Sequence, residues 1–204
     1  MLKNILGKAL RILIYSGYLL GLSLVFLHDA STITDGDKFI ESSLTEYFQE
    51  GAFFITVIMY FLCAKLYRPN RSISVVLGGF FLMAFVREFD AFLDFYLYDG
   101  AWQTLVVIIL VAVTYRTYKY WHPMTESIYN YANSFPFGLM LAGMMVTFVY
   151  SRLFGEPFMW QTLMEENYLR SVKNAAEESI ELLGDSVIMF GSIEYLLYVR
   201  KIKG

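Results

Sequence analysis

Charged side chains inside apolar stretches are the first sign of chemistry in this sequence. An apolar run between residues 72 and 101 contains Arg87, Glu88, Asp90 and Asp94. A charge at bilayer depth costs at least ~2.5 to 3.5 kcal/mol unless it faces the protein interior, a partner or water. Carboxylates near basic partners in such places are typical of proton relays and coupling-ion sites. The run therefore predicts a polar site.

A second set of charges lies in the last apolar stretch. Lys173, Glu177, Glu181 and Asp185 repeat every four residues, and Glu178 lies beside them. Residues four apart share one face of an α-helix. If lipid surrounds the helices, this face must point into the protein.

Depth along each helix predicts that the two sets meet. At about 1.5 Å per residue, Arg87 lies roughly 24 Å from Arg71, and Asp185 lies roughly 22 Å from Arg200. With a hydrocarbon core of about 30 Å, both belong to the outer half of the membrane. The same count brings two further helices to this level. The predicted cluster contains His28, Arg87, Glu88, Asp90, Asp94, Ser151, Arg152, Lys173, Glu177, Glu178, Glu181 and Asp185.

The predicted cluster is more acidic than basic. Seven carboxylates stand against the cations Arg87, Arg152 and Lys173, so internal salt bridges cannot neutralise it. Either some carboxyls carry protons or a cation occupies the site. This favours a cation- or proton-binding site in a small transporter, or in a membrane subunit of a larger assembly.

Two other functions fit the same residues. One is a membrane-embedded, metal-dependent hydrolase for a lipid-like substrate, because oxygen-rich sites suit Mg²⁺, Ca²⁺ or Mn²⁺, and a metal can activate water. Ser151 beside Arg152 would then contact a headgroup phosphate or an oxyanion. The metal ligands would be His28, Glu88, Asp90, Asp94, Glu177 and Glu181.

In the third function the charges only fix helix packing through salt bridges. The charged and aromatic segment at residues 156–172 would then dock a partner protein or a second copy of the chain.

Composition indicates which elements must position these residues. The chain has 204 residues, of which 57% are hydrophobic and 17% charged, against roughly a quarter charged in soluble domains. This predicts an all-α integral membrane protein with the lipid bilayer as its surroundings. A net charge of -3 does not favour nucleic acid. His28 and His122 are expected on opposite sides of the membrane, which argues against haem.

Six apolar stretches predict about six transmembrane helices in one domain, residues 1–204. A short amphipathic outer helix is expected near 38–50, and a polar loop at 119–135. A last helix of about 40 residues, or ~60 Å, would protrude outward. The six stretches are 9–27, 52–67, 73–97, 103–118, 136–154 and 176–199.

Basic residues set the expected orientation. Eleven of the 16 fall on one side of a six-helix arrangement, and by the positive-inside rule that side is cytoplasmic. Both termini are therefore expected in the cytoplasm, in a multi-pass protein of the bacterial inner-membrane type. The eleven are Lys3, Lys8, Arg11, Lys65, Arg68, Arg71, Arg116, Lys119, Arg200, Lys201 and Lys203.

Overall fold

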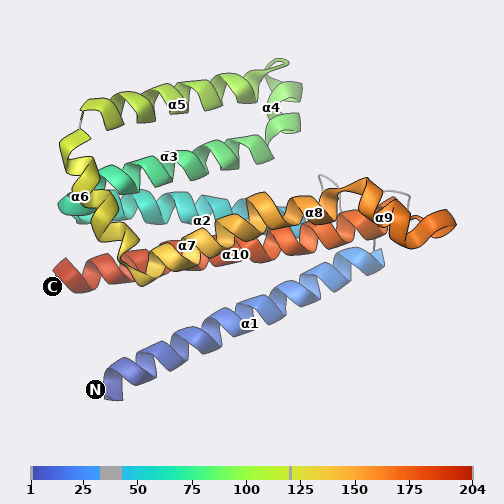
Figure 1. The fold of residues 1–204 in the computed structure, drawn as a ribbon, viewed down its shortest axis with the longest axis horizontal. Coiled ribbons are helices and arrows are strands. Elements are labelled where there is room, and N and C mark those ends of the chain that lie inside the picture. The colour runs from blue at the N-terminus through green and yellow to red at the C-terminus, as the bar shows by residue number, and fades with distance from the viewer. Residues whose placement is uncertain (1, 33–42, 120, 204) are drawn as a thin grey trace. The chain divides into compact units, whose positions relative to one another are not determined.

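The computed structural model describes residues 2–32, 43–119 and 121–203, and the regular elements in these ranges are all helices (Figure 1). Two elements labelled η are 3-10 helices, and η2 is a π-helix. In chain order they are α1 (Leu2–Thr32), α2 (Leu44–Leu66), η1 (Arg68–Asn70), α3 (Arg71–Glu88), α4 (Asp90–Tyr96), α5 (Ala101–Lys119), α6 (Trp121–Ala132), α7 (Phe135–Met145), η2 (Val146–Tyr150), α8 (Ser151–Gly155), α9 (Pro157–Met164), η3 (Glu165–Asn167) and α10 (Arg170–Lys203).

Six helical segments in the described part of the chain are long and apolar enough to cross a membrane, which confirms the prediction of an all-α protein with six such helices. Residues 38–42 of the expected amphipathic helix lie outside the described residues, and residues 44–50 form the first turns of α2. The six segments are Ile5–Thr32, Leu44–Leu66, Arg68–Glu88, Ala101–Lys119, Phe135–Gly155 and Arg170–Ile202.

The predicted 40-residue last helix is wrong, because the chain turns before α10 begins. Glu156 caps α9 by accepting a hydrogen bond from the Phe158 backbone N–H at 3.4 Å. Glu165 then has a φ of 49°, and η3 follows. Two consecutive acids, Glu165 and Glu166, oppose the dipole at a helix C-terminus. A new helix therefore starts at Arg170.

The third apolar stretch also contains a break. The α-helix α3 ends at Glu88, and Phe89 separates it from α4. Asp90 accepts a hydrogen bond from the Ala91 backbone N–H at 2.6 Å, and a carboxylate at this position favours the start of a helix. The spacing of three and four residues between Arg87, Asp90 and Asp94 would place them on one face of a continuous helix, and the break at Phe89 shows that this interpretation is wrong.

The predicted loop at 119–135 is also wrong over most of its length, because residues Trp121–Ala132 form α6. Pro123 falls in the first turn of that helix, where proline is tolerated because the backbone N–H there has no helical partner. Proline therefore marks the start of a helix here and not a loop.

The described chain divides into two compact units. Unit 1 comprises residues 1–49 and 143–186, and unit 2 comprises residues 50–142 and 187–204. In unit 1 the second half of α1 packs along the first half of α10. An open apolar groove of about 450 Å³ lies between these two helix halves. The groove is lined by Leu19, Leu22, Ser23, Phe26, Leu27, Ser179, Leu182 and Leu183.

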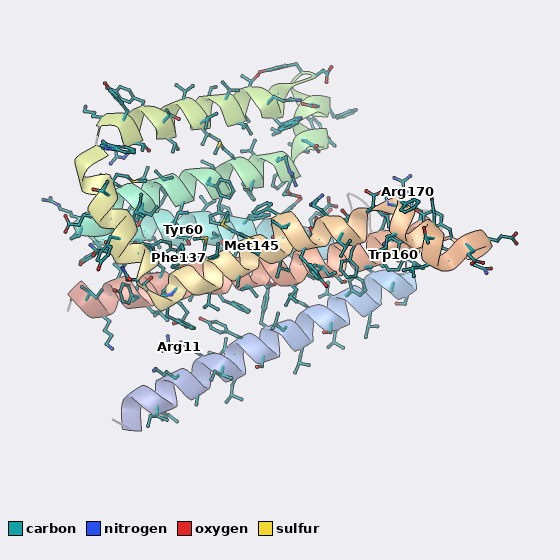
Figure 2. The ribbon with its side chains drawn as sticks, in the orientation of Figure 1. Arg11, Tyr60, Phe137, Met145, Trp160 and Arg170 are labelled. Carbon is teal, nitrogen blue, oxygen red and sulfur yellow. The ribbon has the colours of Figure 1, made fainter. Side chains whose placement is uncertain are left out.

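In unit 2, α3 and α5 lie side by side, and α4 with a turn at residues 98–100 connects them (Figure 1). The turn needs Gly100, whose φ is 90°. The helix α6 packs on α3 and η1. The buried core of unit 2 contains aromatic side chains such as Tyr60 and Tyr131, and the half-buried Phe137 packs against Tyr131; Figure 2 labels Tyr60 and Phe137. The prediction of a single domain stays a prediction.

We predict that Gly191→Ala destabilises the protein and that Gly138→Ala does not. A Cβ at Gly191 would lie 2.9 Å from the Met140 backbone nitrogen. Backbone cannot yield easily, so we expect a loss of about 1–3 kcal/mol. A Cβ at Gly138 meets nothing within 4 Å, so the variant should be neutral or gain up to about 1 kcal/mol. Thermal unfolding in detergent measures both, and equal shifts would contradict the close packing of α7 on α10.

Candidate functional site

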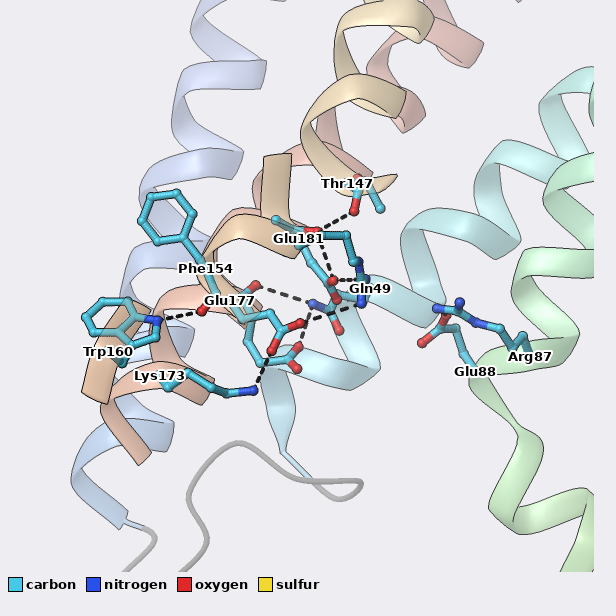
Figure 3. Close-up of polar contacts among 12 residues, drawn as sticks. Gln49, Arg87, Glu88, Thr147, Phe154, Trp160, Lys173, Glu177 and Glu181 are labelled. Atoms are coloured by element: carbon cyan, nitrogen blue, oxygen red, sulfur yellow. Dashed lines mark hydrogen bonds and ion pairs between the residues drawn. The ribbon is translucent and has the colours of Figure 1, made fainter. Parts of the chain in front are cut away.

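The carboxylates of α10 in unit 1 form the best-built polar site in the described chain, and Figure 3 shows their contacts. We define the acidic face of α10 as Glu177, Glu178, Glu181 and Asp185. All four belong to the sequence prediction. The helix brings them together as their spacing predicts, and the partners come from α2, η2 and α8.

Glu181 receives two partners from α8. Its Oε1 makes an ion pair with the Arg152 guanidinium and lies 3.1 Å from the Ser151 hydroxyl. Ser151 is fully buried and also makes a shorter hydrogen bond to the Thr147 backbone carbonyl. A serine hydroxyl has one proton to donate, so two acceptors, the Thr147 carbonyl and Glu181, compete for it.

Glu177 lies between two cations. Its Oε2 is 2.8 Å from the Lys173 Nζ, and its Oε1 is 3.5 Å from Arg152. The carboxylate lies directly against Gly155, where any Cβ would collide with it. The absence of a side chain at Gly155 therefore makes room for this pair.

The remaining two acids accept hydrogen bonds from neutral groups. The Thr147 hydroxyl donates to Asp185 Oδ1 at 2.9 Å, and both side chains are buried. The Gln49 amide donates to Glu178 Oε2 at 3.0 Å. A carboxylate is solvated by such donors much as it is by water. Sequence reasoning missed both donors, because threonine and glutamine carry no charge signal.

The π-helix η2 brings Thr147 and Ser151 onto α10. Gly184 permits the approach, since a Cβ there would lie 2.8 Å from the Thr147 backbone nitrogen. A π-helical segment shifts the register of the side chains that follow it, and such segments are frequent at functional sites. The glycine was a visible signal of close packing, but the π-helix was not.

His28 lies at the end of α1, where its Nδ1 is 3.6 Å from the Asp29 carboxylate. Asp29 itself is buried and accepts two hydrogen bonds from Thr45, one from the backbone N–H at 2.7 Å and one from the hydroxyl at 2.8 Å. It thus fixes the start of α2 on α1. Sequence reasoning did not assign a role to Asp29.

The predicted site residues of unit 2 make local contacts. The Arg87 side chain is 52% exposed and pairs with its neighbour Glu88 at 3.2 Å. Asp94 Oδ1 accepts the backbone N–H groups of Gly100 and Ala101, both at 3.1 Å. Asp94 therefore stabilises the turn into α5. The predicted meeting of these residues with the acidic face of α10 stays a prediction.

The predicted metal ligands fall into both units. Unit 1 holds His28, Glu177 and Glu181, and unit 2 holds the other three. Within the described ranges, no group of three or more His, Cys, Asp or Glu is placed to hold a metal ion. The metal-dependent hydrolase therefore stays a prediction that no observed geometry favours.

The segment at 156–172 contains α9 and η3. Trp160 ties α9 to α8 by donating to the Phe154 carbonyl at 2.6 Å. Phe158 and Leu163 are exposed, as an interface or a membrane surface would require. Docking of a partner protein or a second copy here stays a prediction.

No protein-family model, curated protein or solved structure matches this sequence. The functional argument therefore depends on the site itself.

We predict that Arg152→Leu destabilises the protein more than Arg87→Leu. Arg152 pairs with Glu177 and Glu181, whose side chains are only 16% and 17% exposed. Removing it leaves their charges less compensated, which should cost about 1–3 kcal/mol in view of the partial exposure of Arg152. Arg87 pairs with its sequence neighbour while half exposed, which is worth at most about 1 kcal/mol.

Chemical or thermal unfolding in detergent would compare the two variants under the same conditions. A larger loss for Arg87→Leu would mean that Arg87 compensates buried carboxylates, as the depth count along the sequence predicts.

Proposed function

We propose that the acidic face of α10 binds protons or a cation, and that the protein is a small transporter or a membrane subunit of a larger assembly. The observation that carries the proposal is the position of Ser151 between two acceptors. Its one proton bonds the Thr147 carbonyl, while its oxygen lies 3.1 Å from Glu181. A proton on Glu181 would let Glu181 donate to Ser151, so that both Ser151 contacts become hydrogen bonds, while Arg152 would keep Glu177 as its ionised partner.

The charges around this point support the same conclusion. The site sets four carboxylates against Arg152 and Lys173, so it carries two more negative than positive charges when all groups are ionised. Inside an apolar environment such an excess favours the uptake of protons or of a cation. The neutral donor Thr147 bonds Asp185 without adding a positive charge to the site.

The proposal includes a place in the membrane. Six apolar helices and basic residues gathered on one side favour a multi-pass protein of the bacterial inner membrane with both termini cytoplasmic. The acidic face of α10 would then lie in the outer half of the bilayer. Protons or cations would reach it from the outer side.

We predict that Glu181→Gln removes a pH- or ion-dependent change in thermal stability. Glutamine keeps the size and can donate to Ser151 but cannot take a proton. A cation at about 100 times its Kd should raise the wild-type Tm by on the order of 5 to 10 °C. The measurement is thermal unfolding in detergent between about pH 5 and 8, with and without Na⁺, K⁺ or Mg²⁺.

Glu166→Gln is the matched control, because Glu166 is an exposed acid of the same unit. It should keep the wild-type profile. If wild type and Glu181→Gln respond identically to pH and to every ion, the site binds neither protons nor a cation.

The orientation has its own test. A fluorescent protein fused after Gly204 should be fluorescent, and alkaline phosphatase fused there should be inactive, because the first folds in the cytoplasm and the second needs the periplasm. The reverse result would place the acidic face of α10 towards the cytoplasm. It would not contradict the proposal that this face binds protons or a cation.

A further inference from the structure

The core of unit 2 contains a second polar site that the proposed function does not use. Tyr60 from α2, Tyr131 from α6 and Tyr195 from α10 are each at most 2% exposed. Their rings touch, with centroids 4.6 Å apart for Tyr131 and Tyr195 and 5.8 Å for Tyr60 and Tyr195. Their hydroxyls must find partners inside the protein.

The hydroxyl protons of Tyr60, Tyr131, Tyr195 and Ser74 outnumber the hydrogen bonds that these hydroxyls make in the described chain. Tyr60 and Tyr131 share one hydrogen bond of 2.7 Å, in which either can donate. Burial raises the pKa of Tyr131, so both hydroxyls keep their protons. One proton of the pair lies in the bond, and the other needs an acceptor.

Among the described residues, no hydrogen bond joins the Tyr195 hydroxyl to the Tyr60–Tyr131 pair. Ser74 donates to the Asn70 backbone carbonyl at 2.7 Å, so the Tyr195 hydroxyl, 3.1 Å away, donates to Ser74. This accounts for the protons of Ser74 and Tyr195. The second proton of the Tyr60–Tyr131 pair is not used by them.

Asn70 supplies unused donors and an acceptor in the same core. It precedes α3 in the N-cap position, but its side chain does not cap the helix. The Ser127 hydroxyl of α6 instead accepts the Ile73 backbone N–H at 3.1 Å. The Asn70 side chain lies within reach of the Tyr195 hydroxyl, and it is 1% exposed. Within the described chain, however, neither its Oδ1 nor its Nδ2 meets the distance and angle of a hydrogen bond.

A third polar group of this core, the hydroxyl of Thr56, lies one helical turn from Tyr60 on α2. Thr56 is four residues before Tyr60, or about 6 Å along the helix. Its hydroxyl is buried and has no hydrogen-bond partner among the residues that the structure describes. Buried polar groups of this kind are usually satisfied by ordered water.

We propose that Asn70 and the Tyr60–Tyr131 pair bind an internal water molecule in the core of unit 2. The ligand must donate to Asn70 Oδ1 and accept from Asn70 Nδ2 and a tyrosine hydroxyl. Water does both, whereas a cation would face N–H and O–H donors and an anion would face Oδ1. Because the side chains around this point are buried, the ligand must be small, and water is the small molecule that buried polar groups usually bind.

Radiolytic hydroxyl labelling of the full-length protein in detergent, with H₂¹⁸O added, tests this. A bound water is converted to a radical in place, so Tyr131 and Tyr195 should be oxidised several-fold faster than their exposure allows. Phe81 is the matched control, because it is an equally buried ring stacked on Tyr60 at 5.7 Å. Equal slow labelling of Phe81 and the tyrosines would overturn the proposal.

Asn70→Leu should abolish the fast labelling of Tyr195 and lower the Tm, because it removes the groups that hold the water. If Asn70→Leu raises the Tm, the amide was simply unpaired and no water is bound there, since an apolar replacement relieves an unpaired buried group. Should Asn70→Leu fail to fold, Tyr131→Phe tests the same site. It should slow the labelling of Tyr195, and unchanged labelling would count against the water.

Discussion

The ion pair between Arg152 and Glu181 is the interaction on which the arrangement of unit 1 depends. A carboxylate in an apolar helix is tolerated only where a partner is brought to it. Here that partner is Arg152 of α8, and two features of unit 1 bring it close to Glu181. The π-helix η2 changes the register before Arg152, and Gly184 lets η2 approach α10. The packing of the helices thus follows from the need to solvate charge.

The two units stabilise their buried polar groups with different kinds of partners. Unit 1 places ionised groups on α10 and meets them with cations and neutral donors. Unit 2 buries tyrosine, serine and asparagine side chains, whose hydrogen bonds are directional but carry no charge. Neutral groups cost less to bury than ions, so unit 2 can enclose them fully. Unit 1 keeps Arg152 half exposed.

The features of the fold that depend on hydropathy and helical spacing could be predicted from the sequence. The six apolar helices and the shared face of Glu177, Glu181 and Asp185 follow from the sequence. The break at Phe89 and the turn at Glu165 do not follow from the sequence, because the backbone conformation and hydrogen bonds of single residues determine where these helices end. The donors Thr147 and Gln49 could not be predicted either, since tertiary packing alone brings them to α10.

The roles of the four acids on α10 differ because their partners differ. Asp185 and Glu178 each accept a hydrogen bond from a neutral donor, which stabilises an ionised carboxylate. Glu177 lies between Lys173 and Arg152, so two cations compensate its negative charge. Glu181 shares Arg152 with Glu177, and its contact to Ser151 is to a hydroxyl whose proton also bonds the Thr147 carbonyl. The four acids therefore share one helix face but differ in whether a cation, a hydroxyl or an amide stabilises them.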